Sequence, residues 1–159
     1  MPIAAPARPH RVLFLCTGNS ARSILAECLL NRLGSGRFEA MSAGSQPAGH
    51  VHPIALELLA RNNLPTAALR SKSWDEFAGA TMTAFDTVIT VCDSAAREAC
   101  PVVPAAARFH WSIPDPAAAT GADADRRAAF ESVYAELEAR IRAFVHDECG
   151  RAEASGDRE

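Results

Sequence analysis

The sequence predicts a single α/β domain in which helices flank a four-stranded parallel sheet. Its 159 residues, 48% of them hydrophobic, suit one domain with a substantial core. Short apolar runs rich in β-branched residues alternate along the chain with segments of helical periodicity. This alternation favours right-handed crossovers between parallel strands, and in such sheets the functional crevice lies at the carboxyl ends of the strands.

The first predicted strand, residues 11–15, leads directly to Cys16 and then to a helix that opens near Ser23. Cys16 stands six positions before Arg22. A junction of this kind points consecutive backbone N–H groups and the positive end of the helix dipole into one concave nest. We therefore expect a site for a tetrahedral oxyanion, lined by Thr17, Gly18, Asn19, Ser20, Ala21, Arg22 and Ser23.

Cys16 is the candidate nucleophile of this nest. Amide donors, a helix N-terminus and a nearby guanidinium all stabilise negative charge, so they favour the thiolate form of the sulfur at neutral pH. The planar fork of Arg22 can grip two oxygens of the anion, and Ser23 is placed to donate a hydrogen bond to the sulfur. Gly18 lets the loop close tightly, and Asn19 tolerates a left-handed backbone. The alternative is a buried structural cysteine beside an unrelated surface arginine.

The next elements continue the alternation of strands and helices. Residues 38–43 are predicted as the second strand, and residues 42–44 form the turn that closes it. Pro53 opens a helix that extends to position 61, and His52 before it is expected to be a capping or surface residue. Residues 70–77 suit a short capped helix, with a rim around the active site as the alternative.

A third strand is predicted at residues 87–92 and ends at Cys92, as the first strand ends at Cys16. Because both cysteines would lie at the carboxyl edge of the sheet, two thiols that are distant in the sequence could meet in space. The polar stretch that follows, residues 93–104, contains Cys100 and lacks the apolar periodicity of a stable helix. We expect it to be a mobile loop or a frail helix.

The chain continues with a fourth short strand at residues 108–111, a proline-rich loop and a long helix. Asp115 stands between two prolines in that loop, and the sequence around it is that of a turn residue. Apolar residues then recur with helical spacing over residues 130–145, with charged residues between them. This pattern predicts an amphipathic helix that closes the core.

Composition narrows the classes of function. A net charge of −3 gives no basic surface for nucleic acid, and no apolar run reaches the length of a membrane span. Five cysteines without paired CxxC clusters argue against a disulfide framework and against a metal site. We therefore expect a cytoplasmic monomer without a bound metal or cofactor. Its domain should span residues 10–149, between a flexible lead-in at 1–9 and a disordered tail at 150–159.

One stretch resembles a known phosphate loop, that of low-molecular-weight protein tyrosine phosphatases and of the arsenate reductases that share their fold: Cys16-Thr17-Gly18-Asn19-Ser20-Ala21-Arg22-Ser23. The resemblance covers nearly the whole chain and implies a flavodoxin-like winding of the sheet. It also implies that Asp115 is the general acid and that residues 42–44 support the phosphate loop. Ala117 stands where the phosphatases typically carry a tyrosine, and this departure counts against phosphotyrosine as the substrate.

The resemblance leaves two enzymes and one binding module as alternatives. A phosphatase would hydrolyse phosphate monoesters with Cys16, Arg22 and Asp115, and it has no use for further thiols. In an arsenate reductase, a second thiol resolves the adduct between Cys16 and arsenic; here that thiol would be Cys92, and Cys100 would then take up the disulfide. We favour the reductase because it also uses Cys92 and Cys100, for which the phosphatase has no role. The third alternative is a catalytically idle oxyanion-binding module.

The resemblance also implies an external thiol reductant and a thiol-disulfide reductase protein as partner. The loop between Cys92 and Cys100 is longer than in the thioredoxin-coupled branch, so the donor stays open. The candidates are thioredoxin, glutathione with glutaredoxin, and mycothiol with mycoredoxin. Phosphate or sulfate would act as mimics of arsenate in such a site.

Overall fold

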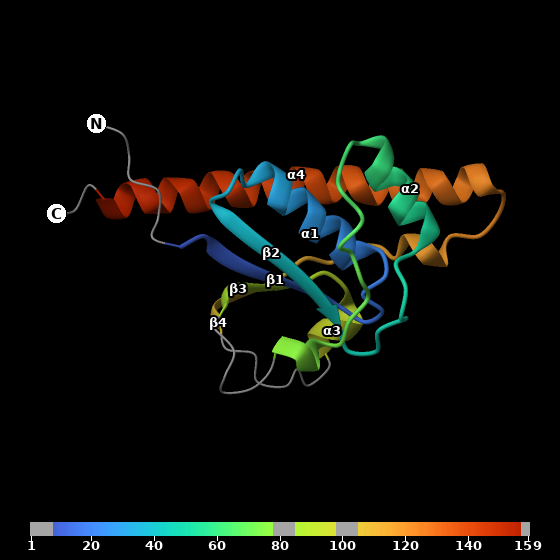
Figure 1. Cartoon of the computed structure of the whole chain (residues 1–159), viewed down its shortest axis with the longest axis horizontal. Helices are drawn as coiled ribbons and strands as arrows, with labels where there is room; N and C mark the ends of the chain where they lie inside the picture. Colours follow the sequence, from blue (N-terminus) through green and yellow to red (C-terminus); the bar gives the residue numbers. More distant parts are fainter. Residues whose placement is uncertain (1–7, 78–84, 98–104, 157–159) are drawn as a thin grey trace.

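Four parallel strands form one sheet in the order β2-β1-β3-β4 (Figure 1). They are β1 (His10–Cys16), β2 (Phe38–Gly44), β3 (Phe85–Thr90) and β4 (Ala105–His110). The computed structural model describes residues 8–77, 85–97 and 105–156. Each strand lies within a few residues of its predicted position, so the prediction of a four-stranded parallel α/β domain is confirmed.

The chain winds outward from β1 in both directions. β1 pairs with β2, to which it is joined by helix α1 (Arg22–Leu33), and on its other side β1 pairs with β3. The strand order therefore reverses between β1 and β3, as the predicted flavodoxin-like winding requires. Ligands of doubly wound sheets bind at such a switch point, outside the carboxyl ends of the strands. Cys16, the last residue of β1, stands at this point.

Helices cover both faces of the sheet (Figure 1). One face packs against α1, α2 (Pro53–Arg61) and α4 (Asp123–Gly156), and the other against the 3₁₀-helix η1 (Trp74–Phe77). The central strand β1 sends alternate side chains to these two cores: those that face the first are Val12, Phe14 and Cys16, and those that face the second are Leu13 and Leu15. Because it is buried on both faces, β1 appears in the sequence as a continuous apolar run.

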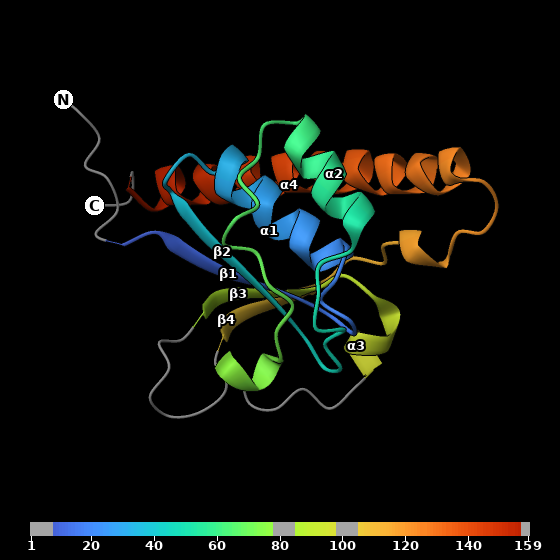
Figure 2. The same cartoon turned by 45° about the vertical axis from the view of Figure 1, so that its right-hand side comes forward.

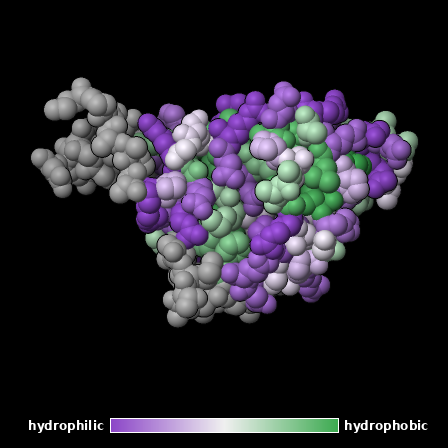
Figure 3. Space-filling model, in the orientation of Figure 1, coloured by the Kyte–Doolittle hydropathy of each residue, from purple (hydrophilic) through white to green (hydrophobic). Residues whose placement is uncertain are grey.

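The solvent-facing surface of the helices is not uniformly polar. In Figure 3, hydrophilic side chains dominate the view, and an apolar area lies over α2. Ile54 and Leu56 of α2 are partly buried and pack against the larger core, whereas Leu58 and Leu59 are buried in it. α2 is therefore anchored by one apolar face.

Helix α3 (Asp93–Arg97) lies at the carboxyl ends of β1 and β3, as Figure 2 shows from the side. The preceding strand ends at Thr90, earlier than predicted, because Cys92 stands directly before α3 and caps its first turn. The Cys92 Sγ accepts the N–H of Ala95 at 3.3 Å, and its carbonyl oxygen accepts the N–H of Ala96 at 3.2 Å. A frail helix was one of the two forms predicted for this stretch; residues 98–104 lie outside the described residues.

Helix α4 is longer than predicted at both ends. It begins at Asp123, where two acidic residues in its first turn suit the positive end of the helix dipole. It extends to Gly156, into the segment that the sequence analysis assigns to the tail. Among the described residues, no helix is long and apolar enough to cross a membrane.

The predicted lead-in is only partly described. Residues 1–7 lie outside the described residues. Arg8 forms a two-point contact with Asp86, with its Nη1 2.7 Å from Oδ2 and its Nη2 2.8 Å from Oδ1. The last residues of the lead-in are thus tied to the start of β3.

Candidate active site

Residues 17–21 form a loop that joins β1 to α1 at the carboxyl edge of the sheet. Asn19 adopts a left-handed backbone with φ of 45°, so it is this residue, and not Gly18, that takes the strained position of the loop. Its side chain is fully buried, which is unusual for an asparagine in a loop. The expectation that Asn19 would tolerate this backbone is confirmed.

Backbone N–H groups of the segment after β2 hold this loop from the outside. The donors are Ser45, Gln46, Ala48 and His52, and the acceptors are the carbonyl oxygens of Cys16 (3.2 Å), Thr17 (2.9 Å), Gly18 (2.9 Å) and Ser20 (2.9 Å). The described residues contain no cis peptide bond, and in a trans peptide the N–H points opposite to the C=O. Carbonyl oxygens that face outward therefore turn the following N–H groups toward the concave side, as an oxyanion site requires.

Gly44 allows the two segments to approach this closely. A Cβ at this position would collide with the carbonyl oxygen of Thr17, so only glycine fits between β2 and the loop. The structure is in line with the support that the resemblance implied for residues 42–44.

The sulfur of Cys16 lies inside the nest, and the residue is only 2% exposed. Its Sγ accepts the N–H of Asn19 at 3.1 Å and lies 2.8 Å from the Oγ of Ser23. The Nδ2 of Asn19 donates to the same Oγ at 2.8 Å, which leaves the hydroxyl hydrogen of Ser23 for the sulfur. The three side chains thus form a directed chain from Asn19 through Ser23 to Cys16.

The acidity of Cys16 differs from our expectation. Burial raises the pKa of its thiol, and this effect outweighs the hydrogen bonds from Ser23 and Asn19, which lower it. The hydrogen bonds to the sulfur therefore offset part of the effect of burial on the pKa of Cys16, but not all of it. The sequence pattern reveals the donors around the sulfur, but it does not reveal how deeply the sulfur is buried.

Arg22 and Asp115 meet at the mouth of the loop. The Nη1 of Arg22 donates to the carbonyl oxygen of Ile113 at 3.0 Å, and its Nη2 lies 3.9 Å from the Oδ2 of Asp115. The other oxygen of Asp115 accepts the N–H of Ala117 at 3.0 Å and so caps the short 3₁₀-helix η2 (Pro116–Ala118). Asp115 is thus a turn residue, and at the same time it faces the predicted anion ligand.

Cys92 lies on the other side of the loop and is buried. Its Sγ is 3.5 Å from the Oγ1 of Thr17, the residue that follows Cys16, and a negative charge on Cys92 would raise the pKa of Cys16. The expectation that adjacent strand ends bring two cysteines together agrees with this geometry. Cys100 lies outside the described residues.

Two further residues near the site carried little signal in the sequence. His110, at the end of β4, lies 2.7 Å from the Oγ1 of Thr90 through Nδ1 and 2.9 Å from the Oδ1 of Asp93 through Nε2. It thereby ties β4 to the first residue of α3. His52 accepts the N–H of Ile54 at 3.1 Å and caps α2, which confirms the capping role that we expected.

The other cysteines lie apart from the loop. Cys28 is buried in α1, where burial and the nearby Glu27 raise the pKa of its thiol to about 12. Cys149 in α4 accepts a hydrogen bond from the Nη1 of Arg37 at 3.1 Å. Within the described residues, no group of three or more His, Cys, Asp or Glu side chains is arranged to hold a metal ion.

Comparison with known proteins shows a family match over most of the chain. The family described as low molecular weight phosphotyrosine protein phosphatase matches residues 11–154. An arsenate reductase of Halalkalibacterium halodurans is 34% identical over 135 residues, which are 84% of this chain and 94% of that protein. The crystal structure of an arsenate reductase from Archaeoglobus fulgidus is similar, with 32% identity and a TM-score of 0.66 over 85% of this chain and 98% of that one. A thioredoxin-dependent arsenate reductase of Corynebacterium glutamicum shares 25% identity with a TM-score of 0.65, over 89% of this chain and 62% of that one.

Proposed function

Because the chain belongs to the low molecular weight phosphotyrosine protein phosphatase family, and its relatives include arsenate reductases, we propose that it reduces arsenate to arsenite with Cys16 as the nucleophile. The observation that carries this proposal is the second buried thiol, Cys92, against Thr17 of the oxyanion loop. Hydrolysis of a phosphate ester needs no second thiol. Reduction of arsenic needs two electrons, which two thiols supply when they become a disulfide.

Arsenate would bind as a tetrahedral oxyanion in the loop. The inward N–H groups would hold its oxygens, and the guanidinium of Arg22, beside the loop, can donate to two of them. Since burial raises the pKa of Cys16, the thiol proton has to leave as the anion binds, and an oxygen of arsenate is a suitable acceptor. Ser23 would then donate its hydrogen to the thiolate.

The first chemical step forms a bond between sulfur and arsenic. The Cys16 thiolate attacks arsenic, one As–O bond breaks, and that oxygen leaves as water after it receives a proton. Asp115 is the proposed donor of this proton, because its carboxyl group lies beside Arg22 and is half exposed to solvent, from which it can be reprotonated.

The second step reduces arsenic. The Cys92 thiolate attacks the sulfur of Cys16, a disulfide forms between them, and the electron pair of the broken S–As bond stays on arsenic. Arsenic(V) thereby becomes arsenic(III), and arsenite leaves. An external thiol system must then reduce the disulfide, and Cys100 is the candidate that carries it to the surface. Thioredoxin, glutathione with glutaredoxin, and mycothiol with mycoredoxin are the candidate donors, with the resemblance to a thioredoxin-dependent reductase in support of the first.

The test is arsenite formation by the purified protein with each donor system in turn, alongside hydrolysis of p-nitrophenyl phosphate. We expect arsenite with one of the donors and none from Cys16→Ser, since a hydroxyl cannot supply the electrons. Ester hydrolysis without arsenite formation would assign the protein to the phosphatases instead. Tight phosphate binding without either reaction would make it an oxyanion-binding module.

A further inference from the structure

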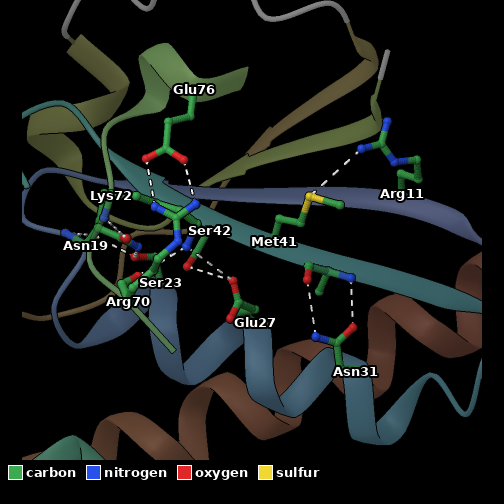
Figure 4. Close-up of polar contacts among 12 residues, drawn as sticks. Arg11, Asn19, Ser23, Glu27, Asn31, Met41, Ser42, Arg70, Lys72 and Glu76 are labelled. Carbon is green, nitrogen blue, oxygen red and sulfur yellow. Dashed lines mark hydrogen bonds and ion pairs between the residues drawn. The ribbon is translucent and has the colours of Figure 1, made fainter. Parts of the chain in front are cut away.

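Helix α1 carries a polar stripe that begins in the catalytic loop. Its members recur at every fourth position, and they are Asn19, Ser23, Glu27 and Asn31. Residues at this spacing share one face of a helix, and Figure 4 shows that this face is turned to the edge strand β2 and the segment beside it. Asn31 pairs with the backbone of Ala40 through two hydrogen bonds, and Glu27 accepts the hydroxyl of Ser42 at 3.0 Å.

The only lysine of the chain, Lys72, meets this stripe. Its Nζ lies 3.8 Å from the Oε1 of Glu27 and donates to the carbonyl oxygen of Arg70 at 3.2 Å. The side chains of Lys72 and Glu27 are only 9% and 13% exposed. Burial lowers the pKa of Lys72 and raises the pKa of Glu27, while the opposite charge of each partner counters the shift. Burial therefore disfavours the charged form of both side chains, and each charge is stabilised by its partner.

The segment that carries Lys72, residues 70–73, also holds the catalytic loop; we refer to it as the strap. The backbone N–H of Lys72 donates to the Oδ1 of Asn19 at 2.9 Å, and the hydroxyl of Ser71 donates to the carbonyl oxygen of Gly18 at 3.1 Å. The bond to Oδ1 fixes the orientation of the Asn19 amide, so that its Nδ2 faces Ser23. The strap therefore sets the first member of the chain of donors that ends at the Cys16 sulfur.

Stability alone does not explain why a lysine and a glutamate are buried here. Desolvation of two charges costs more than their attraction commonly returns, and an apolar pair of similar size is often at least as stable. A buried ion pair does, however, fix a segment in one place, because either partner is costly to leave alone. Here it joins the strap to α1, one helical turn beyond Ser23.

We propose that the Lys72–Glu27 ion pair is a positioning device for the Cys16 nucleophile. It fixes the strap against α1, and the strap holds Asn19 in the orientation that lets Ser23 donate to the sulfur. This inference rests on the proposed function only in that Cys16 is the reactive thiol. A second mechanism, in which the ammonium of Lys72 stabilises the thiolate through its own electric field, predicts a different outcome.

The two mechanisms predict shifts of different sign in the pKa of Cys16, and the variants Lys72→Met and Glu27→Gln distinguish them. The measurement is the rate of iodoacetamide alkylation of Cys16 against pH, followed by mass spectrometry of the peptide that contains it. If the pair acts by position, both variants lose donors to the sulfur, and the midpoint moves to higher pH in both. If the field of Lys72 acts directly, loss of the cation raises the midpoint and loss of the anion lowers it.

The controls use an exposed ion pair away from the strap. The Nη1 of Arg61 lies 3.4 Å from the Oε1 of Glu131, and their side chains are 60% and 52% exposed. Arg61→Met and Glu131→Gln should leave the midpoint for Cys16 where it is in the wild type. The double variant Glu27→Gln with Lys72→Met has no unpaired buried charge, so it keeps the test open if a single variant does not fold.

Upward shifts in both single variants, or in the folded double variant, support the proposal. Opposite shifts in the single variants, or a wild-type midpoint in the folded variants, overturn it. Alkylation needs no arsenate, so these results do not depend on whether arsenate is the substrate. Where the protein turns over arsenate, kcat/KM should fall on the order of tenfold in Lys72→Met and remain unchanged in Arg61→Met.

Discussion

The Nη2 of Arg22 lies 3.9 Å from the Oδ2 of Asp115, and this contact joins the start of the first helix to the loop after the last strand. Arg22 is the first residue of α1, directly after the loop, whereas Asp115 also caps the short helix η2. The proposed anion ligand and the proposed proton donor are thus brought together by elements that lie far apart in the sequence. In the proposed mechanism, these are the two groups that substitution at an oxyanion centre needs.

Asp115→Asn separates the two roles of this residue. An asparagine can still accept the N–H of Ala117, so the cap of η2 is kept, but it cannot donate an acidic proton. We expect kcat for arsenate to fall on the order of 10²-fold and the pH dependence that belongs to this acid to disappear. Asp75→Asn, on η1, is the matched control and should behave as the wild type. An unchanged pH profile in Asp115→Asn would leave Asp115 as a turn residue only.

Arg22→Lys tests whether the planar guanidinium of Arg22 contacts two oxygens of the anion. The charge is retained, but the lysine cannot hold the carbonyl oxygen of Ile113 and two oxygens of the anion in one plane. We expect kcat/KM to fall by about tenfold or more, and Arg61→Lys, on the exposed end of α2, to have no effect. A loss below about threefold, or roughly 0.7 kcal/mol, would mean that Arg22 does not contact the anion.

The sequence was sufficient for the parts of the fold that depend on local pattern. The buried strand β1 and the turn of direction at Cys16 follow from a continuous apolar run and a polar junction. Pro53 marked the start of α2 at the residue where the structure has it. The left-handed position of Asn19 and the contact of Ser23 with the sulfur follow from the residue types within one short loop.

The remaining features depend on contacts between distant segments. The bonds that hold the oxyanion loop come from backbone N–H groups after β2, and these groups have no signature in the sequence. Lys72 had no visible partner, because Glu27 lies far away in the chain and the two meet only when the strap packs on α1. The raised pKa of Cys16 likewise reflects burial, which only the packed structure reveals.

Ser23→Ala should make Cys16 a weaker acid. The hydrogen bond from Ser23 lowers the pKa of the thiol, so its loss adds to the effect of burial and raises the pKa further. At about pH 7.5, we expect the alkylation of Cys16 to slow by at least about threefold. Cys28 provides an internal control, since its pKa of about 12 should keep it unlabelled in both proteins. Equal alkylation rates at Cys16 would contradict a hydrogen bond from Ser23 to the thiolate.

Asp86 should make stability depend on acid pH. The guanidinium of Arg8 and the N–H of Arg11 lower the pKa of Asp86 from 3.8 to about 2. The unfolded chain therefore binds this proton more readily, and the stabilisation is present above pH 3.8 and is lost as the pH falls toward about 2. We expect Asp86→Asn to lower Tm at neutral pH, with a deficit that shrinks across this window. A deficit that is constant from neutral pH to pH 2 would show that the ionisation of Asp86 contributes nothing.

The fate of Cys92 decides how the proposed enzyme resolves its own adduct. Its Sγ accepts the N–H of Ala95 at the start of α3, so a disulfide between Cys92 and Cys16 would remove this cap. α3 has only five residues, and a helix this short has little stability of its own. Loss of the cap should loosen it, and the α-carbon of Cys100 could then come within about 7 Å of that of Cys92, as a disulfide requires.

We therefore expect one turnover with arsenate, without reductant, to leave a Cys92–Cys100 disulfide that mass mapping can detect. In Cys100→Ser the disulfide should remain between Cys16 and Cys92, because no third thiol can attack it. Cys149→Ser, in the distant part of α4, is the matched control and should give the same disulfide as the wild type. Full activity of the double variant Cys92→Ser with Cys100→Ser, with glutathione or mycothiol as donor, would refute the internal shuttle. In that case an external thiol would resolve the arsenic adduct at Cys16 directly, and the contact between Cys92 and Thr17 would be one of packing alone.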